Sequence, residues 1–101
     1  MWLFALFDLP VGTKQQRRAY TRFRKKLLEH GFTKLQFSVY AQFCPSEEAS
    51  IAKRRVVRES LPHEGQIRLV SVTDKQFASQ EILLGKLHED PEEPLGQGLL
   101  F

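Results

Sequence analysis

A cluster of basic residues between positions 14 and 26 is the most distinctive chemical feature of the sequence. Seven of the chain's 15 lysines and arginines fall there, and the next acid along the chain is Glu29. Helices that are stabilised by surface salt bridges usually alternate the two signs of charge, which this segment does not do. The seven basic residues are Lys14, Arg17, Arg18, Arg22, Arg24, Lys25 and Lys26.

Arginine and lysine donors match phosphate oxygens, and such contacts bind a nucleic-acid backbone without reading its sequence. The cluster therefore predicts a nucleic-acid-binding surface. A solvated, charge-rich helix is the plainer interpretation, and attachment to a membrane surface is a third. We expect the phosphate contacts to come from five residues: Lys14, Arg17, Arg18, Arg22 and Lys25.

Asp8 is the residue best suited to metal chemistry. It ends an otherwise apolar run, where an unpaired carboxylate is costly to bury. Carboxylate oxygens suit Mg²⁺ or Mn²⁺, and an ion held between the Asp8 residues of two protomers could activate water for phosphodiester hydrolysis. The plainer interpretation is an exposed carboxylate that hydrogen-bonds the following loop. Asp74 is the only other plausible acidic ligand.

Other reactive side chains carry weaker indications. His30, His63 and His88 fall at a helix end, a turn and the tail, as solvated histidines usually do. The single cysteine, Cys44, excludes an internal disulfide and a cysteine-based zinc site. Phosphate-loop, zinc-protease and serine-hydrolase motifs are absent from the sequence. Three aromatic residues are expected in the core rather than as base-stacking residues: Tyr20, Phe23 and Phe37.

The elements that must position these residues follow from the apolar spacing. Residues 2–9 are apolar at odd and even positions alike, which indicates a central strand covered on both faces. A helix is predicted over residues 14–29, with Thr13 and Gln16 as its capping box and Gly31 after its end. The stripe of this helix that should face the core consists of Gln16, Ala19, Tyr20, Phe23 and Leu27.

The second half of the pattern begins with an extended region over residues 32–43. Residues 32–34 form a separate short strand in this prediction, and a half-buried strand follows. Ser46 begins a second helix over residues 47–60, and a further strand spans residues 66–73. The apolar side of the half-buried strand consists of Leu35, Phe37, Val39, Ala41 and Phe43, and the stripe of the second helix of Ala49, Ile51, Ala52 and Val56.

This order of elements predicts an α+β, ferredoxin-like βαββαβ fold with a late C-terminal strand. Two helices cover one face of an antiparallel sheet, and no further helix is expected for the other face. We therefore expect a homodimer that packs sheet face to sheet face. The fold should occupy residues 1–86, followed by an acidic linker and an apolar tail over residues 87–101.

Length and composition agree with such a domain. The chain has 101 residues, of which 42% are hydrophobic and 27% charged, so wholesale disorder is not expected. The net charge is +3, and every apolar run is far shorter than the roughly 20 residues of a membrane span. We expect a soluble, cytoplasmic protein without a membrane segment.

Three stretches carry a family resemblance: WLFALFDLP at the start, RRAYTRFRKKLLEHGFTKLQFSVY after it, and LPHEGQIRLVSVTDKQF later. On these stretches the chain resembles the CRISPR-associated protein Cas2 family over residues 1–85. Its GLLF terminus is most similar to the variants that accompany single-effector, type II systems.

The resemblance implies a ferredoxin-like homodimer with Asp8 as the catalytic residue and Mg²⁺ ligand of an endonuclease acting on RNA or double-stranded DNA. It also implies a role in spacer acquisition, in which the dimer bridges the Cas1 integrase and scaffolds duplex DNA. A toxin-type, metal-dependent ribonuclease and a non-catalytic nucleic-acid-binding module are the alternatives. The tail is expected to dock on the integrase or on the partner protomer through Leu99, Leu100 and Phe101.

Overall fold

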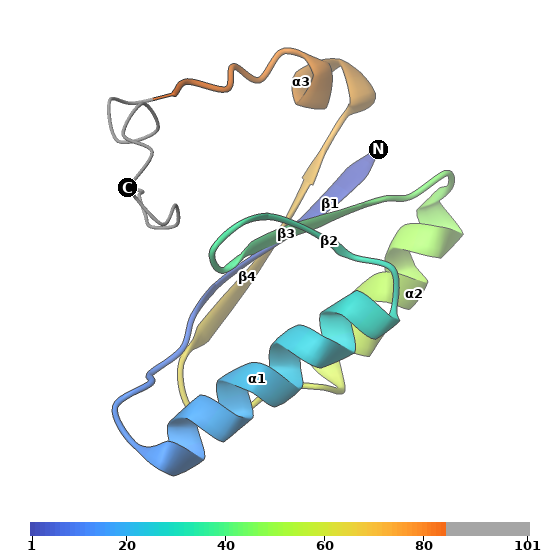
Figure 1. Ribbon diagram of the computed structural model, residues 1–101. Coiled ribbons are helices and arrows are strands. Elements are labelled where there is room, and N and C mark those ends of the chain that lie inside the picture. The colour runs from blue at the N-terminus through green and yellow to red at the C-terminus, as the bar shows by residue number, and fades with distance from the viewer. Residues whose placement is uncertain (85–101) are drawn as a thin grey trace.

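Four strands form one antiparallel sheet, and two long helices lie against one of its faces (Figure 1). The computed structural model describes residues 1–84. In chain order the elements are β1 (Trp2–Asp8), α1 (Lys14–Glu29), β2 (Thr33–Gln36), β3 (Val39–Phe43), α2 (Glu47–Arg58), β4 (Gln66–Val72) and α3 (Asp74–Ala78). The sheet order is β2-β3-β1-β4, with every neighbouring pair antiparallel. The predicted α+β, ferredoxin-like arrangement is confirmed.

β1 is the central strand, as its two apolar faces predict. Leu3, Ala5 and Phe7 are buried on the side that carries α1 and α2. The opposite face of the sheet, here called the open face, carries Trp2 and Leu6, which are half-buried. Asp8 lies on the open face too, because alternate residues of a strand share a face.

The boundaries of α1 are those predicted. The Thr13 hydroxyl accepts a hydrogen bond from the Gln16 backbone N–H at 3.1 Å, and the Gln16 side-chain oxygen accepts one from the Thr13 backbone N–H at 3.0 Å. Gly31 follows the helix with a positive φ of 93°, a conformation that favours glycine. Phe23 and Leu27 are buried in the predicted stripe.

The region from residue 32 to 43 contains the separate short strand that was predicted, but the chain turns later than expected. β2 and β3 form a hairpin with a two-residue loop, Phe37 and Ser38, and Ser38 has a positive φ of 63°. The loop reverses the chain, so Leu35 and Phe37 do not share a buried side with the residues of β3. Instead Tyr40 is buried opposite Ala5, while Phe37 is 71% exposed.

The expected stripe of α2 is confirmed in part, because Ala49 packs against the core and Val56 is half-buried. Ser50 and Val57 are the buried residues of this helix, whereas Ile51 and Ala52 are exposed. Two polar contacts accompany this orientation. The Lys53 ammonium donates to the His30 backbone oxygen at 2.9 Å, and the Arg54 guanidinium donates to the Ser71 hydroxyl.

α3 reaches the face that no further helix was expected to cover. The Phe77 ring stacks on Trp2 and also lies 5.9 Å from the ring of Phe4. Residues 79–84 form no strand, so the expected late strand is not found in them. The later part of the chain, including the predicted linker and tail over residues 87–101, lies outside the described residues.

Candidate functional site

Asp8 ends β1 at the open face of the sheet. It is exposed, lies opposite Gln66 of β4, and is two residues from Leu6, which lies opposite Arg68. The strand end and the tip of the β2–β3 hairpin enclose a shallow hollow of about 250 Å³, here called the Asp8 hollow. Its lining residues are Leu6, Phe7, Asp8, Phe37, Ser38, Val39, Gln66 and Arg68.

The Asp8 carboxylate is free to bind a cation. Within residues 1–84 its oxygens accept no hydrogen bond, whereas the Gln66 side-chain oxygen accepts one from Arg68 at 3.3 Å. Asp74 is not part of this hollow, because it pairs with the Met1 amino group at 3.0 Å at the other end of β1. No group of three or more metal-ligating side chains occurs in the described part of the chain. The described part of one chain therefore supplies a single carboxylate to this hollow, which fits one half of a Mg²⁺ or Mn²⁺ site shared between two copies.

The structure brings the five predicted nucleic-acid-binding residues together. All five are exposed, and with Thr21 they line one shallow hollow along α1. We call this set the α1 basic face: Lys14, Arg17, Arg18, Arg22 and Lys25. Within residues 1–84 no acidic residue lines that hollow, so no described acid neutralises the positive charge of the face there.

Two arginines of α1 also contribute to the fold, which the sequence did not indicate. One Arg17 nitrogen donates to the backbone oxygens of Val11 at 3.1 Å and Gly12 at 3.3 Å, and so fixes the loop between β1 and α1. Arg24 is half-buried near Tyr40. Burial raises the pKa of the Tyr40 hydroxyl, and the neighbouring Arg24 guanidinium partly opposes that rise. Arg24 is therefore less available to a ligand than the residues of the α1 basic face.

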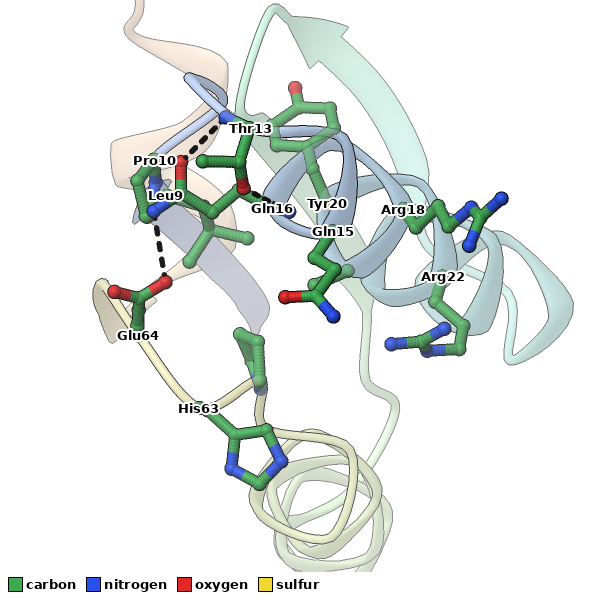
Figure 2. Close-up of a pocket in the computed structure, with 12 residues that line it drawn as sticks. Leu9, Pro10, Thr13, Gln15, Gln16, Arg18, Tyr20, Arg22, His63 and Glu64 are labelled. Atoms are coloured by element: carbon green, nitrogen blue, oxygen red, sulfur yellow. Dashed lines mark hydrogen bonds between the residues drawn. The ribbon is translucent and has the colours of Figure 1, made fainter.

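A deeper pocket of about 640 Å³ lies between the start of α1 and the loop before β4. Figure 2 shows Arg18 and Arg22 extending from α1, with His63 and Glu64 on the loop. The Gln16 side-chain nitrogen donates to the Glu64 carboxylate at 3.0 Å, which fixes this acid at the start of the helix. Arg18 and Arg22 line both this pocket and the hollow along α1, so the two are adjacent.

Phe37 was expected in the core but is exposed, whereas Phe23 is buried as predicted. The Phe37 ring stacks on Tyr20, with ring centroids 5.5 Å apart and planes at 18°. Arg68, Gln66 and the exposed Phe37 are the members of the Asp8 hollow that sequence reasoning missed. Only Arg68 could have been placed in part from the sequence, because the alternation along β4 puts it on the side opposite Ile67 and Leu69.

The remaining candidate residues either belong to the structural framework or lie beyond the described residues. Cys44 is buried, which raises the pKa of its thiol. The His30 ring lies 3.0 Å from the Lys26 backbone oxygen at the end of α1. His88 and the tail residues Leu99, Leu100 and Phe101 lie outside the described part. No helix within residues 1–84 has the length and apolarity that crossing a membrane requires.

Comparison with known proteins identifies one family. Residues 1–80 match the family described as CRISPR associated protein Cas2. A CRISPR-associated endoribonuclease Cas2 from Flavobacterium psychrophilum is 41% identical over the whole chain and 88% of its own length. A protein of the same name from Parvibaculum lavamentivorans is 40% identical over the full length of both chains. A crystal structure of Streptococcus pyogenes Cas2 shares the fold, with a TM-score of 0.62 and 19% identity over 82% of this chain and 99% of that one.

Proposed function

Because this chain belongs to the CRISPR-associated protein Cas2 family, we propose that it is a homodimer that binds duplex DNA and scaffolds the Cas1 integrase in spacer acquisition. The α1 basic face is the observation that carries this proposal. Five exposed cations line one hollow that no acid of residues 1–84 enters, as contact with a phosphate backbone requires. This role would place the protein in the cytoplasm with the DNA.

The open face of the sheet supports the homodimer. α3 covers it only around Trp2 and Phe4, and the exposed side chains of Phe43 and Val70 remain on it. A second copy packed against this face would bury them. Asp8 lies on the same face, so the packing would also bring the Asp8 residues of both copies to one interface.

A metal-dependent endonuclease activity at Asp8 is the second candidate function. The free, exposed carboxylate favours it, as do relatives that are named endoribonucleases. A bound Mg²⁺ or Mn²⁺ would lower the pKa of a coordinated water and offset charge on a phosphodiester. Asp8 would hold that ion, and the Arg68 guanidinium in the same hollow would pair with the substrate phosphate. RNA and double-stranded DNA are both candidate substrates.

Two alternatives use the same residues differently. A toxin-type ribonuclease would depend on Asp8 and should arrest growth when the protein is expressed alone. A non-catalytic nucleic-acid-binding module would depend only on the α1 basic face. Among residues 1–84, Asp8 is the only acid that lines the Asp8 hollow, and this favours the scaffold over a stand-alone nuclease.

The decisive experiment measures Mg²⁺-dependent cleavage of single-stranded RNA and duplex DNA by wild type and Asp8→Ala, purified side by side. Cleavage that disappears in the variant would establish a hydrolase centred on Asp8, and equal cleavage by both would indicate a contaminant. Duplex binding is measured on the same samples. Failure of the wild type to bind duplex DNA would overturn the scaffold proposal, whereas binding without cleavage would leave a scaffold whose chemistry belongs to its partner.

A further inference from the structure

Phe37 is a large aromatic side chain held outside the core at the edge of the Asp8 hollow. It is 71% exposed, more than any other aromatic residue in the described part of the chain. Its ring stacks on Tyr20, with centroids 5.5 Å apart, so Tyr20 supports it from the side of α1. An exposed aromatic ring that is supported in this way is suited to stack against another flat group.

The position of the ring is fixed by the loop that carries it. The Ser38 backbone oxygen accepts a hydrogen bond from the Phe7 N–H at 3.1 Å, which ties the hairpin tip to the end of β1. The hydroxyls of Ser38 and Tyr20 are 3.1 Å apart and share a second hydrogen bond. These contacts attach Phe37 to the residue that precedes Asp8, so the spacing of ring and carboxylate is built into the fold.

The charges around the ring suit a nucleotide. Arg68 shares the Asp8 hollow with Phe37, and the Lys34 ammonium lies 5.8 Å from the centre of the Phe37 ring. A base stacked on the ring would have two cations nearby for its flanking phosphates. Lys34 is an exposed lysine on a flexible stem, so it can move aside as the base enters.

From this arrangement we infer that Phe37 is a base-stacking residue that positions single-stranded nucleic acid beside Asp8. Bases within a duplex are already stacked on their neighbours, whereas an unpaired base can turn out and stack on an aromatic ring. Phe37 thus gives the protein a binding surface for single strands that is distinct from its surface for duplexes. The α1 basic face takes a duplex backbone, and the Asp8 hollow beside Phe37 takes a single strand. The inference rests on the proposed function of Asp8 only for the chemistry that follows binding.

The test compares wild type with Phe37→Ala and Phe37→Trp in binding a short, labelled single-stranded RNA and a duplex DNA, without divalent cations. Stacking of one base predicts that Phe37→Ala weakens RNA binding between about fivefold and a hundredfold while duplex binding stays within about twofold. Phe37→Trp should restore RNA binding, and the emission of the new tryptophan should be quenched by the RNA. Leu35→Ala, an exposed apolar residue of the same hairpin, is the matched control and should bind both ligands as wild type does.

Several outcomes would overturn the inference. They are RNA binding by Phe37→Ala equal to that of wild type, no RNA binding by wild type, and an equal loss of both ligands. Loss of the dimer in sedimentation experiments would instead make Phe37 an interface residue. Binding is measured without metal, so it does not depend on cleavage. If the wild type never cleaves RNA, the proposed nuclease activity fails but the base-stacking role of Phe37 does not. Where cleavage occurs, Phe37→Ala should raise KM more than it lowers kcat.

Discussion

The ring of Phe77 stacks on the ring of Trp2, with centroids 3.9 Å apart and planes within 6° of parallel. This contact places α3 on the open face at the beginning of β1. The ion pair between the Met1 amino group and Asp74, at 3.0 Å, joins the same two segments. α3 is thus fixed to the sheet by an aromatic stack and one charge pair, and it leaves the Asp8 end of the open face uncovered.

Phe77→Ala should therefore destabilise the protein. Phe77 is half-buried, so the loss should lie below that of a fully buried phenylalanine, at about 1–2 kcal/mol in the free energy of unfolding. Urea unfolding at one fixed protein concentration measures it. Ile51→Ala removes an exposed apolar side chain on α2 and should change the stability by less than about 0.5 kcal/mol. Equal stability of wild type and Phe77→Ala would mean that α3 does not stabilise the fold.

The parts of the fold that the sequence predicted are those with local causes. The capping box of Thr13 and Gln16 sets the start of α1, and the glycine at position 31 follows its end. The position of the turn after β2 was not predicted, because its loop is Phe37–Ser38, without the glycine or asparagine that usually marks a positive φ. The stripe of α2 was only partly predicted because its buried side includes a polar residue, Ser50.

The candidate site was likewise predictable only in part from the sequence. Asp8 could be identified because a lone acid ends an apolar strand, and the α1 basic face because its residues share one helix. The neighbours of Asp8 could not, since Arg68 and Phe37 are far away in the sequence. They meet Asp8 only through the register of β4 on β1 and the position of the hairpin tip.

The buried thiol predicts how stability depends on pH. Burial raises the pKa of Cys44 above its ordinary value of 9.0, so the unfolded chain loses this proton first as the pH rises. The contribution of Cys44 to the free energy of unfolding should be constant below about pH 9. Above that pH it should fall, by up to about 1.4 kcal/mol per pH unit, until the thiol of the folded protein ionises. Tyr40, whose pKa is raised from 10.0, should add a similar fall at higher pH.

Urea unfolding of wild type and Cys44→Ala across that pH range checks this expectation. Cys44→Ala should be less stable at neutral pH, because a buried side chain is shortened, and its stability should decline less steeply above about pH 9. Parallel declines in the two proteins would show that Cys44 does not contribute. A thiol reagent should also modify Cys44 only as fast as the protein opens, since the thiol is buried.

The apolar tail is expected to bind the Cas1 integrase. Removing residues 95–101 should weaken integrase binding at least about tenfold, because Leu99, Leu100 and Phe101 would no longer be buried in the complex. Sedimentation should show the dimer unchanged. A full-length variant with alanine at those three positions separates the loss of apolar side chains from the loss of length. Unchanged integrase affinity of both variants would rule out docking by the tail.

The α1 basic face predicts how duplex binding responds to salt. Arg18 and Arg22 are the residues to reverse, because their side chains make no hydrogen bond within residues 1–84, whereas Arg17 also fixes the loop before α1. Arg18→Glu with Arg22→Glu should weaken duplex binding, since attraction to two phosphates is replaced by repulsion. For each phosphate that the protein no longer neutralises, the slope of log affinity against log salt should also become shallower by about 0.9.

The matched control is Arg55→Glu with Arg58→Glu on α2, which changes the net charge equally but lies outside the hollows along α1. A binding surface made by α1 predicts a large loss of affinity and a shallower slope for the first pair and a small, general loss for the second. Equal effects of the two pairs would mean that the duplex responds only to net charge. Wild-type affinity and slope in the first pair would make the α1 basic face a solvated surface, and duplex binding would then have to come from another part of the protein.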